Sequence, residues 1–274
     1  MKEKNMNNDQ LLGQVLSNVA AQLRGALGNI QGALENIVPP QAREEDKVLD
    51  ENTAILYQSY YRMLRLVGNL SDASQLGQDV PLPLKNGDIA ALVRSICCQA
   101  ENVAALRGQK LLFACEEDEH MTAFNAAGME RVLLNLLSNA MKFTPKGGEI
   151  RVKLSFEEGQ VVLLVSDTGC GIAPELRDTV FDRHLHVERM DPQPYGLGLG
   201  LPICHHIVSG HEGRIEVLSL DGGGTHVRVT IPDRLSSTVQ VNDFRFDYAG
   251  GFNHVLLELS DALPAKAFLK EYMD

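Results

Sequence analysis

Asn135-Leu-Leu-Ser-Asn139-Ala-Met-Lys142-Phe-Thr144 is the stretch of sequence that decides the fold. It lies in a strongly apolar run, 128–143, whose periodicity predicts a helix. Spaced at i, i+4 and i+7, the two asparagines and the lysine share one face of that helix. An amide oxygen can ligate Mg²⁺, and an ammonium group can meet phosphate oxygens. Taken alone, the segment is equally compatible with a helix that carries solvated polar positions.

A second segment, Asp167-Thr-Gly169-Cys-Gly171, directly follows the predicted strand 160–166. A carboxylate at a strand end can accept a hydrogen bond from the exocyclic amine of adenine. Glycine lets the backbone turn sharply beside a flat base. Turns of this composition are common, so this segment by itself indicates little.

Two further segments complete the series. Phe181-Asp-Arg-His184 comes first, and Gly196-Leu-Gly198-Leu-Gly200 then leads into a predicted helix. Alternating glycines before a helix N-terminus form a loop whose amides can surround a phosphate. A single glycine run of this kind is again a weak signal. All four segments in this order, on a helix, a strand end and a loop, are a specific pattern.

With these four segments, residues 85–232 resemble the ATP-binding catalytic domain of sensor histidine kinases, within the GHKL superfamily. In that family the segments are the N, G1, F and G2 boxes. The resemblance implies a Bergerat-type α/β sandwich with ATP and Mg²⁺ as ligands. It implies that Asn139 holds Mg²⁺, that Lys142 contacts phosphate, and that Asn135 lines the same site.

The resemblance also implies roles for the loops. Asp167 would bind the adenine amine, with Gly169 and Gly171 forming the turn. Three glycines would hinge a lid over residues 172–195 and meet the phosphates: Gly196, Gly198 and Gly200. His184 stands where the family has a second phenylalanine, a change that affects the packing of the lid.

Position 135 distinguishes branches of the superfamily. The gyrase-type, heat-shock-chaperone and mismatch-repair ATPases resemble this site but carry a glutamate there as general base. The amide of Asn135 cannot abstract a proton at neutral pH. We therefore expect phosphoryl transfer or nucleotide binding rather than steady ATP hydrolysis.

Residues 1–80 are expected to form a long helical hairpin. Apolar residues recur every three or four positions as far as Ile37, after which Pro39-Pro40 ends the first helix. A second apolar stripe runs from Leu49 to Ala73. Because one hairpin cannot bury both of its faces, two copies should pair as a dimeric four-helix bundle. The stripe of the first helix consists of Leu12, Val15, Val19, Leu23, Ala26, Ile30, Leu34 and Ile37.

The hairpin resembles the dimerisation and phosphoacceptor domain of sensor histidine kinases, but it lacks the acceptor histidine. The family motif His-Glu-Leu-Arg-Thr-Pro-Leu matches in register at Leu23, Arg24 and Leu27. This register puts Ala21 in the place of the phosphorylated histidine and Gln22 in the place of the adjacent acid. No histidine occurs anywhere before His120. A methyl group cannot be a nucleophile, so we expect no catalytic residue in this hairpin.

The fold class expected from these patterns is α+β, a helical hairpin followed by an α/β sandwich. Residues 1–80 form the hairpin and residues 85–235 the ATP-binding catalytic domain. A linker, 77–87, joins them. Residues 236–274 are expected to be a strand-and-helix extension that packs on the catalytic domain.

Composition excludes several classes of protein. The formal net charge of the 274 residues is −11, which argues against a nucleic-acid binder. Five cysteines without a C-x-x-C pair indicate reduced thiols rather than a disulfide framework or a zinc site. The most apolar short run, 161–165, is too short to span a bilayer, and no signal peptide is evident. We therefore expect a soluble, cytoplasmic protein.

Three functions remain to be weighed. The first is a homodimeric two-component signalling protein that binds ATP and Mg²⁺ and cannot autophosphorylate on its own hairpin. The resemblance implies a response-regulator receiver domain or another signalling protein as its partner. The second is an active histidine kinase that phosphorylates a partner in trans. The third is a GHKL serine kinase of the anti-sigma type, a family that lacks the long hairpin of residues 1–80.

Overall fold

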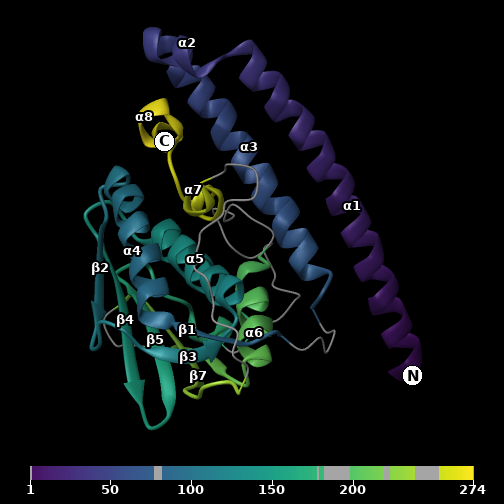
Figure 1. Ribbon diagram of the computed structural model, residues 1–274, viewed down its shortest axis with the longest axis vertical. Coiled ribbons are helices and arrows are strands. Elements are labelled where there is room, and N and C mark those ends of the chain that lie inside the picture. Colours follow the sequence, from purple (N-terminus) through teal and green to yellow (C-terminus); the bar gives the residue numbers. More distant parts are fainter. Residues whose placement is uncertain are drawn as a thin grey trace. The chain divides into compact units, whose positions relative to one another are not determined.

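The computed structural model describes residues 2–76, 82–177, 179–181, 198–218, 223–237 and 253–273. The chain divides into two compact units (Figure 1). Residues 1–78 and 263–274 form a helical unit, which we call the hairpin unit. Residues 79–262 form a mixed α/β unit, which we call the catalytic unit after the domain that residues 85–232 resemble. The expected class, α+β with a helical N-terminal region and an α/β sandwich, is confirmed.

Two long helices dominate the hairpin unit. They are α1 (Lys2–Ile37) and α3 (Lys47–Ala73), joined by the short helix α2 (Pro40–Glu45). Pro40 occupies the first position of α2, where its missing N–H is not needed. Asp46 is the N-cap of α3, since its carboxylate accepts hydrogen bonds from the amides of Val48 and Leu49. The break expected at Pro39-Pro40 is therefore a compact connection with a helix of its own.

The face of α1 that packs on α3 is made mainly of small and medium-sized side chains. Ala20 and Leu27 are buried there, and the Tyr60 hydroxyl lies 3.1 Å from Gln31 Oε1. Most of the stripe seen in the sequence lies elsewhere on the helix. Its exposed members, between 42% and 77% accessible, are Val15, Val19, Leu23, Ile30 and Ile37. On α3 the exposed apolar residues are Val48, Ile55, Leu56 and Met63.

The end of the chain completes the hairpin unit. It contributes the 3₁₀ helix η3 (Ala265–Phe268) and the short helix α8 (Lys270–Met273). The Phe268 side chain is fully buried, and its ring meets Tyr61 of α3 edge-on with 5.2 Å between centroids. Gln58 Nε2 donates a hydrogen bond to the carbonyl of Leu263 at 2.6 Å. The extension therefore does not pack as one piece on the catalytic unit, because Phe268 finds its apolar partners on α3.

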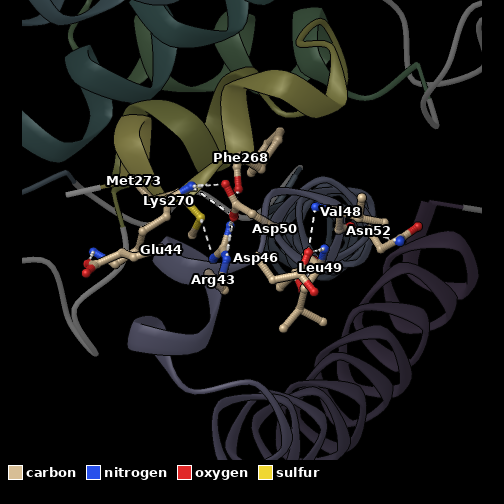
Figure 2. A network of polar contacts seen from close by, with 11 residues as sticks. Arg43, Glu44, Asp46, Val48, Leu49, Asp50, Asn52, Phe268, Lys270 and Met273 are labelled. Carbon is tan, nitrogen blue, oxygen red and sulfur yellow. Dashed lines mark hydrogen bonds and ion pairs between the residues drawn. The ribbon is translucent and has the colours of Figure 1, made fainter.

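Arg43 is the centre of the polar contacts that hold this end of the chain (Figure 2). Its guanidinium donates to Asp50 Oδ1 at 2.7 Å and to the carbonyl of Phe268 at 2.8 Å. It also lies over the ring of Tyr57, 5.0 Å from the centroid. Asp50 in turn accepts a hydrogen bond from the amide of Lys270 at 3.2 Å. The buried charge of Arg43 is thus fully paired, as a buried charge must be.

A five-stranded mixed sheet forms the base of the catalytic unit. Its order is β2 (Lys110–Cys115), β4 (Glu149–Glu157), β5 (Gln160–Asp167), β7 (Thr225–Pro232), β6 (Arg214–Leu218). β2 and β4 are parallel, and the other neighbours are antiparallel. Along β4, Ile150, Val152 and Leu154 are buried while Arg151 and Lys153 are exposed. This alternation shows that one face of the sheet is covered and the other is solvated.

Three helices cover the buried face: α4 (Ile89–Leu106), α5 (Ala126–Phe143) and α6 (Gly200–Gly210) (Figure 1). A short helix, η1 (Pro174–Leu176), follows β5.

In addition, β1 (Lys85–Asp88) pairs with β3 (Met121–Phe124). The sequence analysis assigned most of β1 to the linker, since Lys-Asn-Gly-Asp has no apolar alternation. Pairing with β3, and two hydrogen bonds between Asn86 and the backbone of Ser236, make it a strand.

Among the described helices, α4 alone is long and apolar enough to cross a membrane by length and composition. Half of it is buried inside the catalytic unit, where Ile89, Val93 and Ile96 are almost inaccessible. It packs on β2 and α5. We infer that its apolar character serves the core of this unit.

The helical part of the C-terminal extension that belongs to the catalytic unit is α7 (His254–Leu259). Asn253 caps it by accepting a hydrogen bond from the amide of Leu256. Val255, Leu256 and Leu259 are buried, and α7 packs on α4 and α5. The strands expected around 239–248 lie outside the described residues.

Candidate functional site

The predicted polar face of α5 forms one wall of the candidate site. Asn125 caps this helix through the amide of Gly128, which fixes where its register begins. Asn139 is half-buried, and Asn135 is almost completely buried, with 1% of its surface exposed. A Cβ atom added at Gly200 would lie 3.3 Å from Asn135 Oδ1. Gly200, which the sequence analysis assigned to the phosphate-binding loop, therefore packs at the start of α6 directly on this wall.

Asp167 lies at the end of β5 with a fixed carboxylate. Its Oδ1 accepts hydrogen bonds from the amides of Gly169 at 2.8 Å and Thr225 at 3.2 Å. Burial raises the pKa of Asp167, and the two backbone hydrogen bonds oppose that rise. The Asp167 carboxylate is therefore a partly buried hydrogen-bond acceptor, and the two backbone amides fix its orientation.

Two glycines bring the Asp167 turn against neighbouring segments. A Cβ atom at Gly169 would lie 2.5 Å from the carbonyl oxygen of Phe143, the residue after Lys142. Gly224 has φ +85°, and its amide donates to the carbonyl of Gly169 at 3.0 Å. Neither position can hold a side chain without displacing backbone. The end of α5 and the Asp167 turn are therefore adjacent, as a shared ligand requires.

Thr225 and Gly224 are site residues that the sequence analysis missed. It gave no role to the glycine run before β7. The signal was the strand pairing, because Thr225 is the direct partner of Asp167 in the β5–β7 register. That pairing could not be assigned from the sequence, since several antiparallel arrangements of the strands were open.

The glycine loop before α6 is described in part. Gly198 has φ +67°, and Gly200 begins α6, so the helix N-terminus is at the place expected for phosphate binding. Gly171 also has a positive φ, +75°. Gly196 and His184 lie outside the described residues, as does most of the expected lid. The ring of Phe181 lies 6.1 Å from that of His205 on α6.

Lys142 already has an anionic neighbour. Its Nζ lies 3.3 Å from Asp261 Oδ2, just after α7. Both side chains are largely buried. The sequence analysis did not connect residue 261 with this site, because the two residues are 119 positions apart.

The hairpin unit contains the other predicted positions. Ala21 and Gln22 lie on α1 with exposed side chains. The first histidine of the chain, His120, belongs to the catalytic unit and pairs through both ring nitrogens, with Glu117 at 2.8 Å and Asp233 at 2.9 Å. These contacts account for both of its ring nitrogens.

His211 has a structural role of a different kind. It is buried, its Nε2 accepts the amide hydrogen of Asn125, and Nδ1 lies 2.7 Å from the carbonyl of Ile207. An accepting Nε2 requires that Nδ1 carry the proton and donate it, so this imidazole is neutral. Burial lowers the pKa of His211, although the hydrogen bond to Ile207 opposes the change.

The residues present fit an adenine nucleotide with Mg²⁺. Asp167 offers an oriented acceptor for an amine, and the start of α6 offers backbone N–H groups. Asn139 provides an amide oxygen, the hard type of ligand that Mg²⁺ accepts when phosphates supply further oxygens. Within the described ranges no cluster of three or more His, Cys, Asp or Glu side chains could hold a metal.

Comparisons with known proteins relate the same region of the chain to a family of ATPases. Residues 125–235 match the family model described as "Histidine kinase-, DNA gyrase B-, and HSP90-like ATPase". Sensor protein SrrB of Staphylococcus aureus is 32% identical over 229 residues, covering 82% of this chain and 39% of SrrB. Sensor protein KdpD of Clostridium acetobutylicum is 28% identical over 228 residues, covering 83% of this chain and 25% of KdpD.

Among solved structures, full-length ShkA in complex with AMPPNP is similar over 80% of this chain and 47% of ShkA. The TM-score is 0.59 and the sequence identity 25%. The chain thus spans less than half the length of each of these three proteins.

Proposed function

Because residues 125–235 form a histidine-kinase-type GHKL ATP-binding core, we propose that the chain is a two-component signalling protein that binds ATP with Mg²⁺ without phosphorylating its own hairpin. The observation that carries the proposal is a contrast between two predicted sites. Asp167 and its glycine turns are present and oriented in the catalytic unit. On α1, Ala21 and Gln22 have no group that can accept a phosphoryl or take up a proton.

In the bound state Asp167 would accept the adenine amine, and the amides at the start of α6 would meet phosphate oxygens. Mg²⁺ held by Asn139 would neutralise phosphate charge. Asn135 lies beneath the site and carries an amide, so it cannot act as a general base toward water. These roles favour retention of the nucleotide over its steady hydrolysis.

The hairpin supports a homodimer as the working form. Val15, Val19, Leu23, Ile30 and Ile37 form an exposed apolar row on α1, and α3 exposes four more large apolar residues. A contiguous apolar surface of this kind marks an interaction site. Pairing two hairpins as a four-helix bundle would cover it. The partner that binds the hairpin would then be a response-regulator receiver domain in the cytoplasm.

Calorimetry with Mg-ATP tests nucleotide binding directly. Asp167→Asn should weaken binding by about 1.5–3 kcal/mol, the worth of a hydrogen bond to a charged group. Asp118→Asn is the matched control, since that carboxylate is fully exposed and should leave affinity unchanged. Absence of binding by the unmodified chain would refute the proposal.

Labelled ATP separates this proposal from the alternative kinase. With [γ-³²P]ATP the unmodified chain should not label itself. Transfer to another protein in a native lysate would favour an active histidine kinase that works in trans. Acid-labile self-labelling would refute the part of the proposal that concerns the hairpin.

A further inference from the structure

The ion pair between Lys142 and Asp261 joins the candidate phosphate site to the C-terminal extension. The two charged atoms lie 3.3 Å apart, and the side chains are 15% and 7% exposed. Because both side chains are largely buried, salt only weakly screens the attraction between their charges. Lys142 is therefore already held by an anion before any phosphate arrives.

Lys142 lies at the edge of the site where phosphates are expected. It comes one turn after Asn139 on α5, and its neighbour Phe143 touches the Asp167 turn through the close approach at Gly169. Asp261, in contrast, belongs to none of the four segments that define the site.

Asp261 is fixed in position by contacts on both sides. Before it, the α7 carboxylate of Glu258 pairs with Arg131 of α5. His254 Nδ1 lies 2.8 Å from Glu130 Oε1, also on α5. After it, Arg107 donates a hydrogen bond to the carbonyl of Ala262. The carboxylate is therefore presented to Lys142 by an anchored segment.

We propose that Asp261 is a built-in competitor for the nucleotide phosphates at Lys142. The inference rests on the proposed nucleotide-binding function. A phosphate bound to Lys142 would face a carboxylate of like charge in a poorly solvated place, and the two anions would repel each other. Full engagement of the phosphates thus requires that Lys142 part from Asp261. The extension lowers the affinity of the site for ATP, and ATP weakens the docking of the extension at that point.

Asp261→Asn in the full chain tests the competition. It keeps the shape of the side chain and removes its charge. We expect ATP to bind about 5–50-fold more tightly, within the range usual for coupling between two sites. Adenosine carries no phosphate, so its affinity should not change. Calorimetry measures both ligands, and thermal unfolding checks that the variant remains folded.

Two further variants separate charge competition from loosening of α7. Glu258→Gln removes another buried carboxylate from α7, but one that pairs with Arg131. It should leave ATP affinity within about twofold, and an equal gain would overturn the proposal. In a Lys142→Gln background, Asp261→Asn should have no effect on ATP, because such cycles isolate the pairwise interaction. The hydrogen-exchange rate of residues 254–262 is an independent measurement. Saturating ATP should increase this rate.

The outcomes separate this inference from the proposed function. If the unmodified chain binds ATP and Asp261→Asn binds it equally or more weakly, the competition is refuted while the function stands. Weaker binding would show that Asp261 positions Lys142 for the phosphate. If only the variant binds, the competition is supported, while the proposed function of the unmodified chain fails. If neither binds, both the inference and the proposed function fail.

Discussion

Arg43→Met should detach the C-terminal segment from the hairpin. Methionine keeps much of the length and the apolar contact with Tyr57, but it leaves Asp50 and the carbonyl of Phe268 without the guanidinium that now lies 2.7 and 2.8 Å away. Removing one partner of a buried ion pair costs about 3–5 kcal/mol. Since about 1.4 kcal/mol is a factor of ten, opening of this contact should become roughly 10²–10⁴-fold more frequent.

Hydrogen exchange followed by mass spectrometry measures this locally. Peptides covering 263–273 should lose protection by that factor, while peptides from β4 and β5 should keep theirs. Lys47→Met is the matched control, because its pair with Glu51 is 4.0 Å long and exposed, and such pairs contribute about 0–1 kcal/mol. Unchanged protection of 263–273 in Arg43→Met would refute the reasoning, as would equal loss throughout the catalytic unit.

Three more results are expected. The pKa of His211 is lowered in the folded state. Below about pH 6.5 the His211 imidazole therefore binds a proton more readily in the unfolded chain than in the folded chain. The contribution of His211 to the unfolding free energy should fall below that pH by up to about 1.4 kcal/mol per unit, and His211→Gln should remove this contribution in urea titrations at pH 7.5 and 5.5. Ala21→His with Gln22→Glu should self-label far faster than Ala21→His alone, since general-base help is worth about 10²–10⁴-fold, and labelling that ignores position 22 would mean a wrong register. Leu23→Glu should make the full chain monomeric in light scattering, whereas a persistent dimer would exclude the exposed row as the interface.

The sequence was informative where structure is local. The apolar periodicity of α5 and the proline pair after α1 predicted these helices closely, because both signals act within a few residues. The strand predicted over 160–166 is β5 (Gln160–Asp167). The short polar strand β1 was missed, since its conformation depends on partners that lie 33 to 39 positions further along the sequence.

The candidate site shows the same division. Asp167 and the asparagine face were predicted from residue type, spacing and the resemblance to the family. Thr225 and Asp261 were missed, because their place in the site depends on strand pairing and on where α7 packs. The extension was treated as one piece for a similar reason. Nothing in its local pattern distinguishes Asp261, which pairs with Lys142, from Phe268, which packs on α3.

The partnership of Arg43 with Phe268 has a consequence for the order in which the protein folds during synthesis. These residues are 225 positions apart, and the whole catalytic unit lies between them in the chain. At about 5–20 residues per second, roughly 10–45 s pass between the two. During this interval Arg43 on α2 and Tyr61 on α3 lack their final partners, while the whole catalytic unit is being made. The hairpin unit is therefore begun before the catalytic unit and completed after it, and a chain that stops before residue 263 would never complete it.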